Sequence, residues 1–110
     1  MSSKPYKLAA MLPDKPLQLA EPALYRRLVS ELTPLHLHPF DVKAGARSDP
    51  QGVTVYLRFG EELGQVVSER FTREQIDAGD PGIRAFFQGA AQAMKKALIA
   101  DYYRMMKPEV

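Results

Sequence analysis

The residues of this sequence best suited to metal chemistry are its two histidines, His36 and His38. On an extended strand, side chains two residues apart point to the same side, so the two imidazoles could together bind a zinc ion. Further ligands would have to be Asp or Glu from another strand, because the chain contains no Cys and no other His. We therefore interpret both histidines as half-exposed strand residues, and we expect no metal site and no cofactor.

A second polar set is predicted on one face of a β-hairpin formed by residues 52–59 and 65–71. Apolar and polar residues alternate along the first of these strands, so its polar side chains share one face. Aromatic and arginine side chains on a sheet can stack a base and bind a phosphate, although an ordinary solvated face has the same pattern. This alternative site for nucleic acid or an anionic ligand comprises Tyr56, Arg58 and Arg70, with Thr54 and Ser68 beside them and Lys95 and Lys96 as accessory charge.

No catalytic arrangement of residues is evident. The acidic pairs Glu61–Glu62 and Asp77–Asp80 fall in predicted turns or helix caps, which explain them structurally. The glycines before and within the last helix are too widely spaced for a phosphate-binding loop, and no serine has a nucleophile-elbow context. Without Cys, thiol catalysis, Cys-based zinc sites, iron–sulfur clusters and disulfides are excluded. We favour a non-enzymatic protein, with an enzyme whose pocket forms only on dimerisation as an open alternative.

The C-terminal quarter, residues 80–107, predicts one long amphipathic helix. Asp80 is a suitable N-cap, and Pro81 suits the first helical position because its fixed φ matches the helix. Apolar residues then recur at helical spacing, so one side of the helix should pack in the core. These expected core residues are Ile83, Phe86, Phe87, Ala90, Met94, Ala97 and Leu98.

The last turns of this helix differ from the rest. Asp101 interrupts the apolar stripe, and Arg104 can pair with it from three residues on. Apolar side chains then surround the helix, and such a surface must be covered. The cover is expected to be either the N-terminal arm or a second copy of the chain, since Tyr and Met are enriched at interfaces. The predicted interface residues are Ile99, Tyr102, Tyr103 and Met106.

The remaining elements must position these sites. Residues 21–33 predict a helix with Pro22 in its first turn, one leucine stripe and an end before Pro34. Residues 35–43 predict an edge strand interrupted by Pro39, and residues 44–51 read as a loop. If Gly60 faces Gly64 in the next hairpin, Val55 lies opposite Glu69, Leu57 opposite Val67, Tyr56 opposite Ser68 and Thr54 opposite Arg70.

The predicted fold is an α+β domain with the element order α-β-β-β-(short α)-α. Thr72 and Gln75 form a capping box for the short helix, which ends at Gly79. A three-stranded antiparallel sheet with helices on one face, including the long C-terminal helix, buries every apolar stripe. Residues 1–20 are expected to form an extended or partly disordered arm, and residues 21–110 a single domain.

This element order is similar to that of the double-stranded-RNA-binding domain over residues 21–107. In that family a lysine-rich cluster at the start of the last helix holds phosphates. Residues 80–87 here contain one acid, one base and two phenylalanines. The resemblance is therefore one of topology, and it assigns no family.

Composition adds only broad limits. The 110 residues carry a formal net charge of +2, a weak argument for nucleic acid or membrane partners. No apolar run is long enough to span a membrane, and the run at residues 8–12 is too short for a signal peptide. We expect a cytoplasmic protein–protein interaction module, a homodimer, with nucleic-acid or anionic-ligand binding as the alternative.

Overall fold

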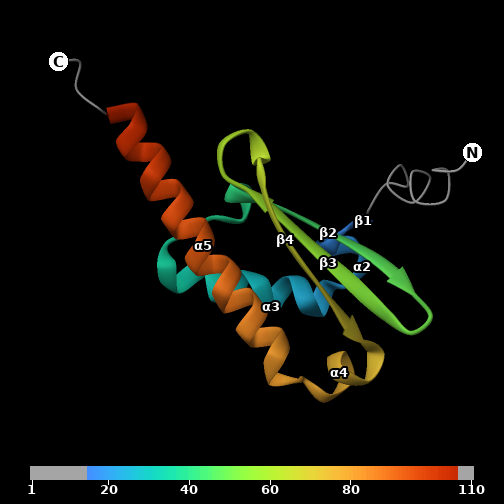
Figure 1. The fold of residues 1–110 in the computed structure, drawn as a ribbon. Helices are drawn as coiled ribbons and strands as arrows, with labels where there is room; N and C mark the ends of the chain where they lie inside the picture. Colours follow the sequence, from blue (N-terminus) through green and yellow to red (C-terminus); the bar gives the residue numbers. More distant parts are fainter. Residues whose placement is uncertain (1–14, 107–110) are drawn as a thin grey trace, which may run out of the picture.

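The computed structural model describes the backbone of residues 15–106 and the side chains of residues 15–104. It confirms an α+β fold with an antiparallel sheet and a long C-terminal helix (Figure 1). The sheet has four strands in the order β1-β2-β3-β4, one more than predicted. The helices are α2 (Leu17–Ala20), α3 (Pro22–Leu32), α4 (Arg73–Ala78) and α5 (Pro81–Met106), and the strands are β1 (Lys15–Pro16), β2 (Val42–Asp49), β3 (Gly52–Phe59) and β4 (Gln65–Thr72).

The two longest helices, α3 and α5, pack against each other on one side of the sheet (Figure 1). Leu24, Leu28 and Leu32 recur every four residues along α3, so all three side chains are buried in the core. The inward residues of β3 and α5 complete this core. They include Val53, Val55, Leu57 and Phe59 from the strand, and Ile83, Phe87, Ala90, Ala91, Met94 and Ala97 from the helix.

The prediction of a strand at residues 35–43 followed by a loop at residues 44–51 is wrong. The strand β2 begins at Val42, and most of the expected loop belongs to it, paired with β3 from Val42–Phe59 to Asp49–Gly52. Its small and polar residues have weak strand propensity, but pairing with β3 overrides that local preference. Asp49 closes the hairpin, because its Oδ1 accepts hydrogen bonds from the backbone N–H groups of Gln51 and Gly52 at 2.8 and 2.9 Å.

The two histidines consequently do not lie on a strand. Two short 3₁₀ helices form here, η1 (Thr33–Leu35) and η2 (Pro39–Asp41), and each has a proline in its first two residues, where the ring fixes φ near the helical value. His36 follows η1 in the left-handed region, at φ 60°. His38 caps η2, and its Nδ1 accepts a hydrogen bond from the backbone N–H of Phe40 at 3.2 Å. The two-imidazole geometry depended on both histidines pointing to one side of a strand, and this segment is not a strand.

The β3–β4 register is the one predicted. Val55 lies opposite Glu69, Leu57 opposite Val67, Tyr56 opposite Ser68 and Thr54 opposite Arg70. The capping box of α4 is also confirmed, with the Thr72 hydroxyl accepting from the backbone N–H of Gln75 at 3.1 Å. Gly79 ends α4 in the left-handed region, at φ 67°, which costs glycine little.

Of the predicted N-terminal arm, only residues 15–20 are described. Lys15 and Pro16 form β1, paired with Ala46 and Gly45 of β2. In α2, the side chain of Leu17 is fully buried in the core. Leu19, in the same helix, is exposed, and residues 1–14 lie outside the described part of the chain.

Candidate functional site

The C-terminal turns of α5 extend beyond the sheet (Figure 1). A helix of 26 residues is about 39 Å long, whereas each of the eight-residue strands spans only about 27 Å. The sheet therefore cannot cover the whole helix. Because Ile83, near the start of α5, is already buried in the core, the excess length falls at the C-terminal end.

Beyond Leu98, α5 exposes large apolar side chains. Ile99 is 46% exposed, Tyr102 58% and Tyr103 68%. The spacing of these residues places them along one stripe of the helix. This stripe is turned away from the stripe formed by Ile83, Phe87 and Met94, which faces the core. Ile99, Tyr102 and Tyr103, three of the four residues that the sequence analysis assigns to an interface, are therefore exposed rather than packed in the core.

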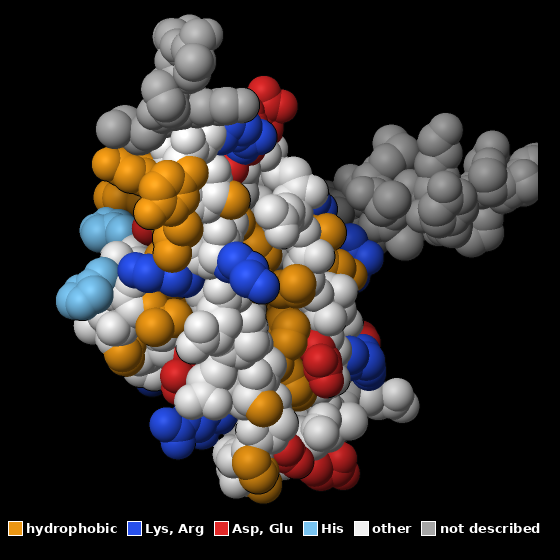
Figure 2. Space-filling model, turned by 60° about the vertical axis from the view of Figure 1, so that its left-hand side comes forward, with side chains coloured by type: hydrophobic (Ala, Val, Ile, Leu, Met, Phe, Trp, Pro, Cys, Tyr) orange, Lys and Arg blue, Asp and Glu red, His pale blue; other side chains and the backbone are white. Residues whose placement is uncertain are grey.

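These side chains surround a hollow of about 540 Å³ between α5 and the segment after η1. Leu37, which is buried, and Leu98, which is half-buried, contribute apolar surface to it, and His36 lies at its edge. We call Leu37, Leu98, Ile99, Tyr102 and Tyr103 the terminal surface. Figure 2 shows hydrophobic side chains gathered near the C-terminal end of α5, beside the histidine side chains.

Charged side chains surround the terminal surface. Arg104 pairs with Asp101, as the sequence predicts, and also with Glu61 of the β3–β4 loop at 2.6 Å. Lys95 Nζ donates a hydrogen bond to the backbone carbonyl oxygen of Leu35 at 2.9 Å. These contacts hold the end of α5 between two loops and give an apolar patch with a polar rim, the usual anatomy of an interface.

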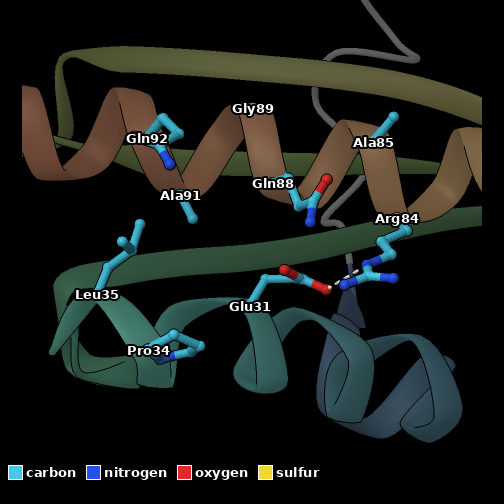
Figure 3. Close-up of a pocket in the computed structure, with 9 residues that line it drawn as sticks. All are labelled: Glu31, Pro34, Leu35, Arg84, Ala85, Gln88, Gly89, Ala91 and Gln92. Atoms are coloured by element: carbon cyan, nitrogen blue, oxygen red, sulfur yellow. Dashed lines mark ion pairs between the residues drawn. The ribbon is translucent and has the colours of Figure 1, made fainter.

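A second groove lies on α5 nearer its start, between that helix and η1 (Figure 3). It has a volume of about 610 Å³, and Arg84 crosses it to pair with Glu31 of α3 at 3.3 Å. Gln88 and Gln92 come from the helix, while Pro34 and Leu35 form the opposite wall. The two charged side chains that line this groove, Glu31 and Arg84, already pair with each other. The groove therefore has fewer unpaired groups for a ligand than the terminal surface has.

Tyr56, Arg58 and Arg70 all lie on the outer sheet face, the face turned away from α3 and α5. Arg70 is engaged there by Asp49 of β2, with its Nη2 donating to Asp49 Oδ1 at 3.1 Å. The hydrogen bond from Arg70, followed by that from the Gln51 backbone, holds the pKa of Asp49 well below its usual range. The same contact raises the pKa of Arg70. Among residues 15–104, Arg58, unlike Arg70, forms no ion pair with a carboxylate.

Replacing Asp49 with Asn should reduce the acid sensitivity of the fold. A carboxylate with a lowered folded-state pKa stabilises the protein above its unfolded pKa of about 4, and this contribution is lost as the pH falls below that value. We expect the melting temperature of the parent to drop more steeply than that of Asp49→Asn between about pH 4 and about pH 2. Thermal melts across this range would test the effect. Exposed Asp77, replaced with Asn, is the control; equal slopes for parent and Asp49→Asn would contradict the prediction.

The sequence missed two cations on the outer sheet face. Lys43 and Arg47 lie on β2, which was not predicted there, whereas Lys15 of β1 pairs with Ala46, a core residue. The available signal was the alternation of Lys43, Gly45 and Arg47, whose side chains would share one face of a strand. The contribution of Leu37 to the terminal surface was missed because its segment was predicted as a strand.

Within residues 15–104, no group of three or more His, Cys, Asp or Glu side chains is placed to hold a metal ion. No helix in the described part of the chain is both long and apolar enough to cross a membrane. The side chain of Met106, the fourth predicted interface residue, lies outside the described residues, although its backbone belongs to α5.

No protein-family model matches this chain, and no curated protein or solved structure matches it significantly. The function must therefore be argued from the site itself.

Proposed function

We propose that this protein acts through protein–protein contacts as a homodimer, and that the terminal surface is where a second copy binds. The observation that carries this proposal is the exposure of Ile99, Tyr102 and Tyr103 around an apolar hollow. Large apolar side chains gathered in one exposed patch mark interaction sites in soluble proteins. Tyr102 and Tyr103 are also the kind of rigid amphipathic residue that dominates interface energetics.

A second copy is favoured because the stripe is self-complementary under a two-fold axis. In an antiparallel pair of α5 helices centred between residues 100 and 101, Ile99 would face Tyr102 of the partner subunit. Leu98 would then face the partner's Tyr103. A two-fold interface requires this reciprocity: if residue i of one subunit contacts residue j of the other, then residue j of the first contacts residue i of the second.

Charge also favours this arrangement. The turn that contains Lys95 and Lys96 would lie beside the C-terminal end of the partner's helix, where the helix dipole is negative. The pair Arg104–Asp101 would remain at the rim, where exposed ion pairs contribute specificity more than affinity. No like-charged side chains are brought together at the centre.

A charge placed in the terminal surface should dissociate the dimer. We expect the double substitution Ile99→Glu/Tyr103→Glu to raise the dimer dissociation constant at least about thirtyfold, because it removes two anchors and buries carboxylates without partners. Sedimentation velocity over a range of protein concentrations measures the constant directly.

The matched control is Ala100→Glu, an exposed position at the same level of α5 but off the stripe. It should leave the dissociation constant within about twofold of the parent, because rim or non-interface changes contribute little. A parent protein that stays monomeric at high concentration would refute the proposal. Equal dissociation by Ala100→Glu and by the double variant would move the interface away from the terminal surface.

A further inference from the structure

The outer sheet face has a charge distribution that its own contacts do not explain. Four cationic side chains point to it from the paired strands, against one carboxylate, that of Asp49. Its formal charge of +3 therefore exceeds the +2 of the whole chain. The four cations are Lys43, Arg47, Arg58 and Arg70. Arg70 engages Asp49, the one carboxylate of the paired strands on this face, so no further acid of these strands balances Lys43 and Arg58.

Two of these cations face each other across neighbouring strands. Lys43 and Arg58 are direct partners in the β2–β3 register, and like charges in that position destabilise a sheet. The residue on the other side of Arg58 is Val66, which brings no compensating acid. Within residues 15–104, no carboxylate forms an ion pair with either cation. An anion between them would remove this repulsion.

A hollow opens at this cationic pair. It has a volume of about 150 Å³, and Lys15 of β1 lines it together with Lys43 and Arg58. Lys15, Lys43 and Arg58 are all exposed, so an anion can reach them from solvent. Two facing cations, Lys43 and Arg58, at a space of this size suit a phosphate group.

An aromatic ring borders the same hollow. Tyr56 lies in the next row of the sheet, between Gly45 of β2 and Ser68 of β4. Neither neighbour has a side chain large enough to cover the ring. Arg47 lies over the Tyr56 ring, with its guanidinium carbon 5.5 Å from the ring centroid. The sheet row that contains Arg47 lies on one side of Tyr56, and the row of Lys43 and Arg58 lies on the other. A planar group attached to a phosphate could therefore lie on the face of the Tyr56 ring that Arg47 does not cover, while the phosphate occupies the hollow.

We infer that the outer sheet face binds a nucleotide, with its phosphate held by Lys43 and Arg58 and its base stacked on Tyr56. The nucleotide is either free or part of a single strand, because both offer the same phosphate and the same ring. Stacking on an aromatic side chain within a cationic sheet is the usual means of binding unpaired bases without sequence preference. The inference is independent of the proposed dimer, because the terminal surface shares no residue with this hollow.

Fluorescence anisotropy with a labelled single-stranded oligothymidylate at low salt tests this inference. The parent should bind, and Lys43→Ser/Arg58→Ser should weaken binding about tenfold or more and reduce the salt slope by about 1.4. Tyr56→Ala should weaken binding about tenfold with the salt slope unchanged, because stacking involves no phosphate charge. The charge-matched control is Arg26→Ser/Arg84→Ser, both exposed and away from this face, which should bind within about twofold of the parent.

Competition by unlabelled AMP identifies the source of the nucleotide. If AMP displaces the oligothymidylate, the site accepts free nucleotides; if it does not, the site requires a strand, and both outcomes support nucleotide binding. No binding by the parent at low salt overturns the inference. Equal losses in the control and in Lys43→Ser/Arg58→Ser also overturn it, as does a Tyr56→Ala variant with parental affinity. Measuring the Ile99→Glu/Tyr103→Glu variant in the same assay distinguishes a failure of nucleotide binding from a failure of the proposed dimer.

Discussion

Replacing Phe87 with Ala should destabilise the protein by about 3–5 kcal/mol, the largest effect we expect from any single substitution. The Phe87 side chain is fully buried, lying among the core residues that join α3, α5 and the sheet. Its ring also contacts that of Phe86, with centroids 5.5 Å apart. Truncation would remove this buried area and leave a cavity between α3 and α5, the two helices that support each other.

The matched control for this prediction is Phe40→Ala. Phe40 is 91% exposed and contacts mainly the ring of His38, so its loss should change stability by no more than about 0.5 kcal/mol. Urea unfolding followed by circular dichroism gives both free energies. Similar losses for the two variants would contradict the assigned core. Since typical domains have only about 5–15 kcal/mol of stability, Phe87→Ala should also weaken dimerisation by loosening α5.

Replacing Gly52 with Ala should destabilise the protein by about 3 kcal/mol, although the change adds one methyl group. A Cβ at this position would lie 2.5 Å from the backbone carbonyl oxygen of Phe71, closer than carbon and oxygen can approach. The obstacle is backbone of the neighbouring strand, which cannot move without disturbing the β3–β4 pairing. The same Cβ would lie 3.2 Å from the Arg70 guanidinium, so the Asp49–Arg70 pair should be disturbed too.

Gly89→Ala is the control for this substitution, and it should have the opposite sign. Nothing lies within 4 Å of a Cβ built at Gly89, in the middle of α5. Alanine in a helix interior is more favourable than glycine by about 1 kcal/mol, so this variant should be more stable than the parent. Thermal or urea unfolding measures both changes. A Gly52→Ala variant as stable as the parent would contradict the close approach of β3 and β4.

Where the local preferences of neighbouring residues all favour the same structure, the sequence was sufficient to predict it. The leucine stripe of α3, the N-terminal proline of α5 and the capping box at Thr72 each follow from local chemistry. The β3–β4 register followed as well, because a short loop bounded by two glycines leaves few alternatives for two alternating strands. Ile99, Tyr102 and Tyr103 were also named from the sequence, although it indicated apolar side chains all round the last turns of α5 rather than one exposed stripe.

Elements that depend on distant partners could not be predicted from the sequence. The residues of β2 read locally as a loop, and only their pairing with β3 makes them a strand. For the same reason, the sequence could not bring Lys43 and Arg58 together, because these cations come from two different strands and one of them is β2. The segment with His36 and His38 was misread because two prolines favour 3₁₀ turns over the extended conformation that alternation alone suggests.

The sequence by itself therefore determined the helices, one hairpin and the stripe of Ile99, Tyr102 and Tyr103, because each depends on spacing along the chain. Only the tertiary structure decided the composition of the outer sheet face, because strand pairing sets which side chains become neighbours. It also decided that Arg70 is engaged by Asp49 while Arg58 faces Lys43. Residue spacing fixes local geometry, whereas the balance of charge on a surface depends on contacts between distant segments.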